Sequence, residues 1–247
     1  TVMYHKDTPL DGTAPLYLYG YGSYGMSMPA SFSILRLSLA QRGIVTATAH
    51  IRGGADMGYG WYLDGKAERK TNTFHDFIAA RDALVERGWV DGARVGAEGR
   101  SAGGMLIGAV ANMAPEKFAA LIGGVPFVDV LATMLDKTLP LTPPEWPEWG
   151  NPLADPQAYQ RLAAYSPIDN VSAQAYPAIL ATGGLTDPRV TYWEPAKWVA
   201  TLRERRTDDG LTLLQMNMGA GHGGASGRFD ALKEEAHDWA FMLWVLG

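Results

Sequence analysis

Short apolar segments alternate along the chain with longer segments of helical periodicity, and this alternation strongly limits the fold. Several apolar segments are continuous, as expected for strands that are buried on both faces of a parallel sheet. Helices are the usual connections in such a sheet. We therefore predict an α/β fold with a mostly parallel central sheet flanked by helices. The strands are predicted at Pro15–Tyr19, Ile44–Ala49, Val95–Glu98, Ala120–Gly124, Ala178–Thr182 and Leu211–Met216, and the helices at Phe32–Gln41, Phe74–Arg87, Gly103–Met113, Glu194–Arg205 and Phe229–Val245.

The proline-rich segment from Pro140 to Pro167 interrupts this alternation. Prolines at this density disfavour regular structure, so we predict an irregular excursion between two strands. Excursions of this kind commonly line or cover a site. Residues 1–247 are otherwise predicted to form a single domain, because α/β folds of this length are often undivided.

Composition excludes several classes of function. The net charge of −5 and the absence of a basic run argue against nucleic-acid binding. No apolar run approaches the ~20 residues of a membrane span. No cysteine is present to form a disulfide, a thiolate metal site or a nucleophile. We expect no metal and no cofactor. The expected location is the cytoplasm, with the periplasm as the alternative, because the chain begins at Thr1 without a signal-peptide pattern or an initiator methionine.

The segment Gly99-Arg100-Ser101-Ala102-Gly103 lies between a predicted strand and a predicted helix. This is the nucleophile-elbow pattern Gly-x-Ser-x-Gly, in which a tight turn holds a serine hydroxyl clear of the sheet. It predicts the α/β-hydrolase fold, with Ser101 as the nucleophile. The alternative is a glycine-rich turn without a catalytic role.

A serine hydroxyl needs a neighbouring base to take its proton. His222 lies in the glycine-rich loop after the last predicted strand, at the carboxyl edge where open α/β sheets place their sites. We therefore predict that His222 is the general base. His50 follows an earlier strand and is the alternative near the site; the remaining candidates are His5, His75 and His237.

The third member of such a triad is an acid on a loop between the serine and the histidine in chain order. Asp187 fits, because it follows the predicted strand Ala178–Thr182. Asp129, after the strand Ala120–Gly124, is the alternative. Asp208 and Asp209 precede the last strand and so lie at the opposite edge of the sheet.

Acyl transfer also requires hydrogen-bond donors for the oxyanion of the tetrahedral intermediate. The backbone N–H of Ala102, directly after the predicted nucleophile, is one donor. The second is expected from the loop after the first strand, Tyr19-Gly20-Tyr21-Gly22-Ser23-Tyr24-Gly25, where a tyrosine hydroxyl can replace a backbone N–H. The alternative is a tyrosine-rich turn that only packs beneath the site.

The chain resembles the catalytic domain of the prolyl oligopeptidase family, and within that family the oligopeptidase B group. The resemblance extends over essentially the whole sequence. It is carried by the tyrosine-glycine loop, Arg52-Gly53-Gly54, Ser101-Ala102-Gly103-Gly104, Val125-Pro126-Phe127-Val128-Asp129, Glu148-Trp149-Gly150-Asn151-Pro152, Tyr165-Ser166-Pro167, Tyr192-Trp193-Glu194-Pro195-Ala196-Lys197-Trp198 and Gly221-His222-Gly223-Gly224.

This resemblance implies a serine peptidase that cleaves short peptides through an acyl-enzyme, with the triad Ser101, Asp187 and His222. It assigns the oxyanion tyrosine to Tyr21 and a substrate-carbonyl contact to Arg189. It further implies that acidic residues receive a basic side chain before the cleaved bond, with Glu145 at one such position. The family also carries an N-terminal β-propeller that screens the site. We expect none within residues 1–247, and we therefore expect these residues to be the C-terminal part of a longer family architecture, with the missing propeller as a partner domain. The oligomeric state stays open.

The chain departs from the oligopeptidase B pattern in its acidic residues. Gln160 stands where a glutamate is usual, five residues before Tyr165, and Pro29 and Ser31 stand where a pair of aspartates is usual. The resemblance therefore implies a weakened preference for basic residues. The alternative functions are an esterase or acylaminoacyl-type hydrolase on the same fold, and a hydrolase fold that binds without catalysis.

Overall fold

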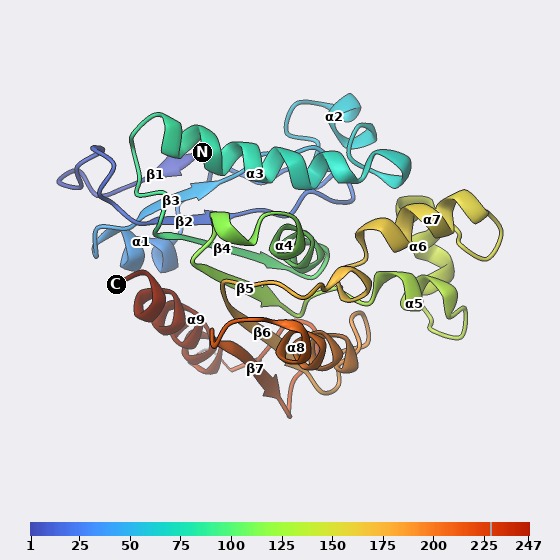
Figure 1. Cartoon of the computed structure of the whole chain (residues 1–247). Helices are drawn as coiled ribbons and strands as arrows, with labels where there is room; N and C mark the ends of the chain where they lie inside the picture. The colour runs from blue at the N-terminus through green and yellow to red at the C-terminus, as the bar shows by residue number, and fades with distance from the viewer. Residues whose placement is uncertain (228) are drawn as a thin grey trace.

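The computed structural model describes residues 1–227 and 229–247, and in this part of the chain seven strands form one sheet (Figure 1). The strand order is β1-β3-β2-β4-β5-β6-β7, and all neighbouring strands are parallel except the β1–β3 pair. This confirms the predicted mostly parallel sheet. The strands are β1 (Val2–Met3), β2 (Leu16–Tyr19), β3 (Val45–Thr48), β4 (Val95–Arg100), β5 (Ala120–Gly124), β6 (Ala178–Gly184) and β7 (Thr212–Asn217).

Helices cover both faces of the sheet, and each face has its own apolar core (Figure 1). Successive strand residues point to opposite faces, so in β5 Leu121 joins one core and Ile122 the other. One face packs against α3, α4 and α8, and the other against α1 and α9. The helices are α1 (Ile34–Ala40), α3 (Thr71–Glu86), α4 (Ala102–Met113), α8 (Trp193–Arg205) and α9 (Asp230–Leu246), within three residues of the predicted bounds.

The proline-rich segment is helical, so the prediction of irregular structure there was wrong. It forms most of an excursion between β5 and β6 that contains α5, α6 and α7 (Figure 1). Pro143 and Pro144 lie in the first turn of α6, and Pro156 begins α7. Prolines are tolerated there because backbone N–H groups of the first turn have no intrahelical acceptor. The helices are α5 (Val130–Leu135), α6 (Thr142–Trp149) and α7 (Pro156–Tyr165).

Other short elements also escaped prediction. The strand β1 has only two residues, which is too short to give a periodic pattern. The remaining elements are α2 (Tyr59–Leu63), η1 (Ala67–Arg69), η2 (Pro115–Lys117) and η3 (Ile168–Asn170). Within the described residues, no helix combines the length and the apolar character needed to cross a membrane.

Candidate active site

Ser101 lies at the turn between β4 and α4, in a backbone conformation that is unusual for a residue with a side chain. Its φ of 58° and ψ of −119° fall outside the regions that most residues adopt. The turn is so tight that a Cβ on Gly99 would lie 2.2 Å from the Gly103 carbonyl oxygen. The Ser101 N–H donates to Gly124 O at 2.8 Å, and Ser101 O accepts from Phe127 N at 3.0 Å. The elbow is therefore fixed by its neighbours on both sides.

His222 and Asp187 come together from the loops after β7 and β6. His222 Nδ1 lies 2.7 Å from Asp187 Oδ2, and the Asp187 side chain is fully buried. The other oxygen, Oδ1, accepts from Arg189 N at 2.8 Å and from Val190 N at 3.0 Å. Burial alone would raise the pKa of Asp187, but the bonds from His222 and these two N–H groups outweigh it and keep the pKa below its usual value. Asp187 is therefore suited to remain an anion beside the imidazole.

The Ser101 hydroxyl makes no hydrogen bond with any residue among 1–227 and 229–247, so its expected bond to His222 is not formed. Catalytic hydrogen bonds are often long in a ligand-free enzyme and tighten when substrate binds. The structure thus contains the hydrogen bond between His222 and Asp187 but not the one between Ser101 and His222. The Ser101 side chain lines a pocket.

The alternative histidines and acids have other partners. His50 Nδ1 lies 2.8 Å from Asp56 Oδ1, and His237 Nδ1 lies 3.0 Å from Gln215 Nε2. Asp129 is buried and forms an ion pair with Lys197. In the described residues these three groups therefore have partners of their own, whereas His222 and Asp187 are paired with each other.

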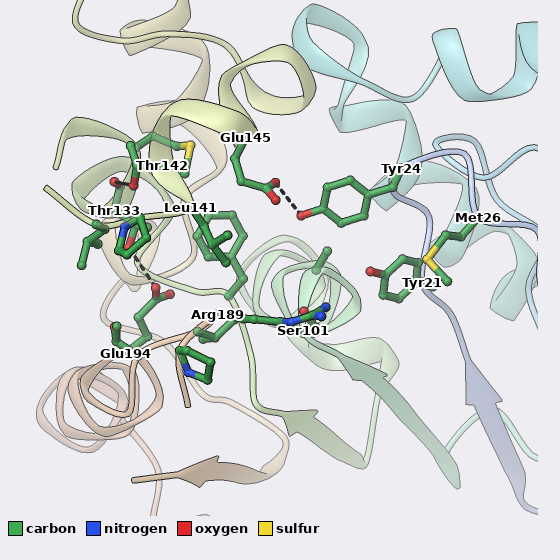
Figure 2. A pocket seen from close by; sticks show the side chains of 18 residues that line it. Tyr21, Tyr24, Met26, Ser101, Thr133, Leu141, Thr142, Glu145, Arg189 and Glu194 are labelled. Atoms are coloured by element: carbon green, nitrogen blue, oxygen red, sulfur yellow. Dashed lines mark hydrogen bonds between the residues drawn. The ribbon is translucent and has the colours of Figure 1, made fainter. Parts of the chain in front are cut away.

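A pocket of about 760 Å³ opens beside Ser101 (Figure 2). The elbow and the tyrosine-glycine loop form one side, and the α5–α6 region and the start of α8 form the other. Three charged side chains reach it from different elements. The lining residues are Tyr21, Tyr24, Met26, Ser101, Ala102, Phe127, Thr133, Met134, Leu139, Pro140, Leu141, Thr142, Glu145, Pro188, Arg189, Val190, Thr191 and Glu194.

Two groups beside Ser101 have the chemistry of oxyanion donors. Ala102 is the first residue of α4, where a backbone N–H has no intrahelical acceptor. The Tyr21 hydroxyl points into the pocket on the side of Ser101 (Figure 2). Burial, with smaller contributions from Tyr19 and Glu145, raises the pKa of Tyr21 to about 12. The phenol therefore keeps its proton at neutral pH and can donate it to an oxyanion.

Arg189 and Glu145 bring opposite charges to the pocket (Figure 2). The Arg189 side chain is exposed, and its positive charge acts to lower the pKa of Tyr21. Glu145 Oε2 accepts from the Tyr24 hydroxyl at 2.8 Å and from Trp149 Nε1 at 2.9 Å. Both residues therefore line the pocket beside Ser101.

Gln160 does not lie in the pocket, so its expected role in substrate binding is not supported. It is exposed on α7 and is not among the lining residues. The buried positions of α7 are Ala158, Leu162 and Tyr165, which share one helix face. Gln160 lies two residues after Ala158 and therefore points away from that face.

Glu194 is a pocket residue that sequence reasoning missed. It is 1% exposed, and its carboxylate accepts from Val128 N, Asp129 N and Thr133 Oγ1, each at 2.9 Å. Burial raises the pKa of Glu194 to about 7. In the sequence it lies within the motif Tyr192–Trp198 that carries the family resemblance, but it received no role of its own, because an acid at the start of a predicted helix is favourable on any helix. Nothing in the local pattern indicated a pocket.

Comparisons with known proteins show which proteins this chain is similar to. A model of the prolyl oligopeptidase family matches residues 30–247. The chain is 54% identical over 247 residues to "Dipeptidyl aminopeptidase BI" from Pseudoxanthomonas mexicana. It is 51% identical over 247 residues to "Protease 2" from Moraxella lacunata. The alignments cover 100% of this chain but only 34% and 36% of the two relatives.

Solved structures of similar sequence have the same fold. Oligopeptidase B from Leishmania major superposes with a TM-score of 0.97 at 50% identity, over 99% of this chain and 34% of that chain. Oligopeptidase B from Trypanosoma brucei, with covalently bound antipain, superposes with a TM-score of 0.97 at 48% identity and the same coverage. The chain therefore spans about a third of the length of these proteins, and its α/β-hydrolase fold is confirmed.

Proposed function

This chain belongs to the prolyl oligopeptidase family, and we propose that it is the catalytic part of a serine peptidase that hydrolyses short peptides. The main support is the hydrogen-bonded pair of His222 and Asp187, which follows neighbouring parallel strands of the sheet that also carries the Ser101 elbow. The chain spans about a third of the relatives' length, so the proposal concerns the chemistry of these residues and not the activity of a longer protein.

The proposed reaction begins with attack of Ser101 Oγ on the carbonyl carbon of the cleaved bond. With Asp187 ionised, His222 Nδ1 carries a proton and donates to Oδ2, so Nε2 is free to accept the serine proton. Asp187 then stabilises the imidazolium. His222 returns the proton to the leaving amine as the C–N bond breaks, which leaves an acyl group on Ser101. Water, activated by the same imidazole, hydrolyses this ester and restores the hydroxyl.

The tetrahedral intermediates of both half-reactions carry a negative oxygen. We assign its two donors to the Ala102 N–H and the Tyr21 hydroxyl. Donors that are already oriented need no reorganisation when the charge develops, and this is why such sites accelerate acyl transfer. Arg189, which lines the same pocket, is assigned to a substrate carbonyl.

We propose that the pocket accepts a basic side chain before the cleaved bond, with Glu145 as its main partner. Glu145 Oε2 accepts two hydrogen bonds, whereas Oε1 accepts none from the described part of the chain. A guanidinium would therefore find an available charged acceptor. The preference is expected to be moderate, because Gln160 lies outside the pocket and Glu194 already accepts three hydrogen bonds.

The name of the Pseudoxanthomonas relative raises a second candidate, the removal of dipeptides from peptide amino termini. Such an activity requires a free α-amine two residues before the cleaved bond. Matched dipeptide substrates with free and acetylated amino termini separate the two candidates. An oligopeptidase should cleave both, whereas a dipeptidyl aminopeptidase should cleave only the free form.

The proposed function is tested by labelling residues 1–247 with a fluorophosphonate, which reacts covalently with an activated serine. We expect labelling of the wild type and none of the Ser101→Ala variant. Hydrolysis of short fluorogenic peptides should fall by about 10³-fold or more in the same variant. The rates of hydrolysis of matched ester and peptide substrates then separate a peptidase, which cleaves both, from an esterase, which cleaves only the ester. Equal labelling of both proteins would contradict the assignment of Ser101, and an absence of labelling in the wild type would favour a binding fold without catalysis.

A further inference from the structure

The loop Gly20–Gly25, which carries Tyr21, is held in place by a buried lysine. Lys70 lies between η1 and α3 and is 1% exposed. Its Nζ donates to the Gly22 carbonyl oxygen at 2.5 Å and to Ser23 Oγ at 2.9 Å. The indole ring of Trp149 lies 5.2 Å from the same nitrogen. A lysine is rarely buried to this extent unless its charge has partners, and two of the partners here are on the tyrosine loop.

A buried glutamate holds the same loop from α6. Glu148 is 5% exposed, and its Oε1 accepts from Tyr24 N at 2.9 Å. Its Oε2 accepts from the Tyr62 hydroxyl at 2.6 Å and lies 4.0 Å from Lys66 Nζ. The loop therefore contacts the Lys70 ammonium at the Gly22 carbonyl oxygen and the Glu148 carboxylate at the Tyr24 N–H. Each charge matches the backbone dipole that faces it.

Both side chains act on the loop and not on the pocket. Neither Lys70 nor Glu148 is among the residues that line the pocket, although Tyr21, Tyr24 and Glu145 are. Burial lowers the pKa of Lys70 to about 7, and the charge of Glu148 opposes this shift. The burial of two charges has a cost that ordinary packing would avoid, which favours a role in fixing the loop over a role in filling the core.

We infer that Lys70 and Glu148 are positioning residues that hold Tyr21 in the orientation needed to donate to the oxyanion. The inference rests on the proposed function, because it requires Tyr21 to be the donor. A loop that loses either contact would retain the phenol but not its fixed direction. Stabilisation of the transition state by a donor depends on that fixed direction.

The inference is tested by a double-mutant cycle between Lys70→Met and Tyr21→Phe. In the wild-type background, we expect Lys70→Met to lower kcat by about 10-fold while KM changes by less than about 2-fold. In the Tyr21→Phe background, the same substitution should lower kcat by less than about 2-fold, because the hydroxyl that it positions is gone. Glu148→Gln should behave in the same way. Lys117→Met is the matched control, since Lys117 bonds Asp82 on α3, away from the tyrosine loop.

The outcomes distinguish the oxyanion role of Tyr21 from the positioning role of Lys70 and Glu148. If Tyr21→Phe leaves kcat unchanged, the oxyanion assignment is wrong and the positioning role is overturned with it. If Tyr21→Phe lowers kcat but Lys70→Met has the same effect in both backgrounds, the oxyanion assignment stands and the positioning role is overturned. Thermal unfolding shows whether each variant folds. If Lys70→Met does not fold, Ser23→Ala removes one Lys70 acceptor and takes its place in the cycle, with the same two outcomes.

Discussion

His222 Nδ1 lies 2.7 Å from Asp187 Oδ2, and the two residues reach each other from neighbouring loops at the carboxyl edge of the sheet. The loops are joined by their backbones as well, since Thr186 N donates to Ala220 O at 3.2 Å. The imidazole is thus oriented by a buried anion whose own position is set by two N–H groups of its loop. This arrangement gives the pair a direct test.

Replacement of Asp187 by asparagine should lower kcat by about 10⁴-fold with little change in KM. The amide is nearly the same size, but it no longer stabilises an imidazolium and can donate to Nδ1, which selects the wrong tautomer. The measurements are kcat for a short fluorogenic peptide and the rate of fluorophosphonate labelling. Asp208→Asn, at an exposed aspartate before β7, is the control with the same chemical change. A kcat within about 10-fold of the wild type would show that the pair is not catalytic.

The sequence was sufficient to predict the members of this pair for a physical reason. Parallel strands end at the same edge, so residues that follow different strands meet even when they are far apart in the chain. The strands themselves gave continuous apolar runs, and Ser101 stands in a turn that few sequences other than Gly-x-Ser-x-Gly can form. Asp187 and His222 could therefore be assigned by their place after β6 and β7.

Side-chain environments were much less predictable. Lys70 and Glu148 look like surface residues in the sequence, and their burial depends on how α6 meets the η1 turn. The direction of Gln160 depends on which face of α7 is buried, and α7 itself was not predicted. Such features arise from tertiary packing, which local patterns do not encode.

Replacement of Glu145 by glutamine should reduce the preference for arginine over leucine before the cleaved bond by about 10-fold, equivalent to about 1.4 kcal/mol. The amide keeps an acceptor for the Tyr24 hydroxyl but loses the charge that would face a guanidinium. The measurement is the ratio of kcat/KM for matched substrates that differ only at this residue.

Two controls make the Glu145 experiment specific. Glu204→Gln changes the net charge equally at an exposed position of α8, and should leave the ratio unchanged. Gln160→Glu adds a carboxylate outside the pocket and should also have little effect. A gain in arginine preference from Gln160→Glu would show that α7 contributes to substrate binding. An unchanged ratio in Glu145→Gln would remove Glu145 from the specificity pocket.

Glu234 of α9 should be required for full activity because it holds both ends of the loop that carries His222. One carboxylate oxygen accepts from Asn217 Nδ2 before the loop, and the other accepts from Ala225 N at 3.0 Å after it. Glu234→Ala removes both bonds, and we expect kcat to fall by about 10-fold with KM nearly constant. Lys233→Ala, at the exposed neighbouring residue, should leave kcat unchanged. Equal kcat values for the two variants would show that the loop is positioned without Glu234.

Asp238 of α9 is a buried carboxyl group close to other acids. It is 4% exposed, and burial, followed by the charge of Glu98, raises its pKa to about 8. Glu235 and Glu234 act in the same direction, whereas Arg100, with Nη1 4.0 Å from Asp238 Oδ2, opposes them. The folded protein therefore binds the Asp238 proton more tightly than the unfolded chain, whose aspartate has an ordinary pKa near 3.8.

A proton bound more tightly in the folded state makes stability depend on pH in a defined direction. The stabilising contribution of the Asp238 proton to the free energy of unfolding is fully present below about pH 4 and is lost as the pH rises through about 8. An amide side chain cannot ionise, so the Asp238→Asn variant should avoid this loss. We expect its advantage in Tm over the wild type to be smallest near pH 5, to grow through neutral pH and to reach roughly 4 °C or more near pH 9. Asp230→Asn, at an exposed position of the same helix, should show no such trend. Thermal unfolding of the three proteins across this range is the measurement, and an advantage that shrinks as the pH rises would contradict the raised pKa of Asp238.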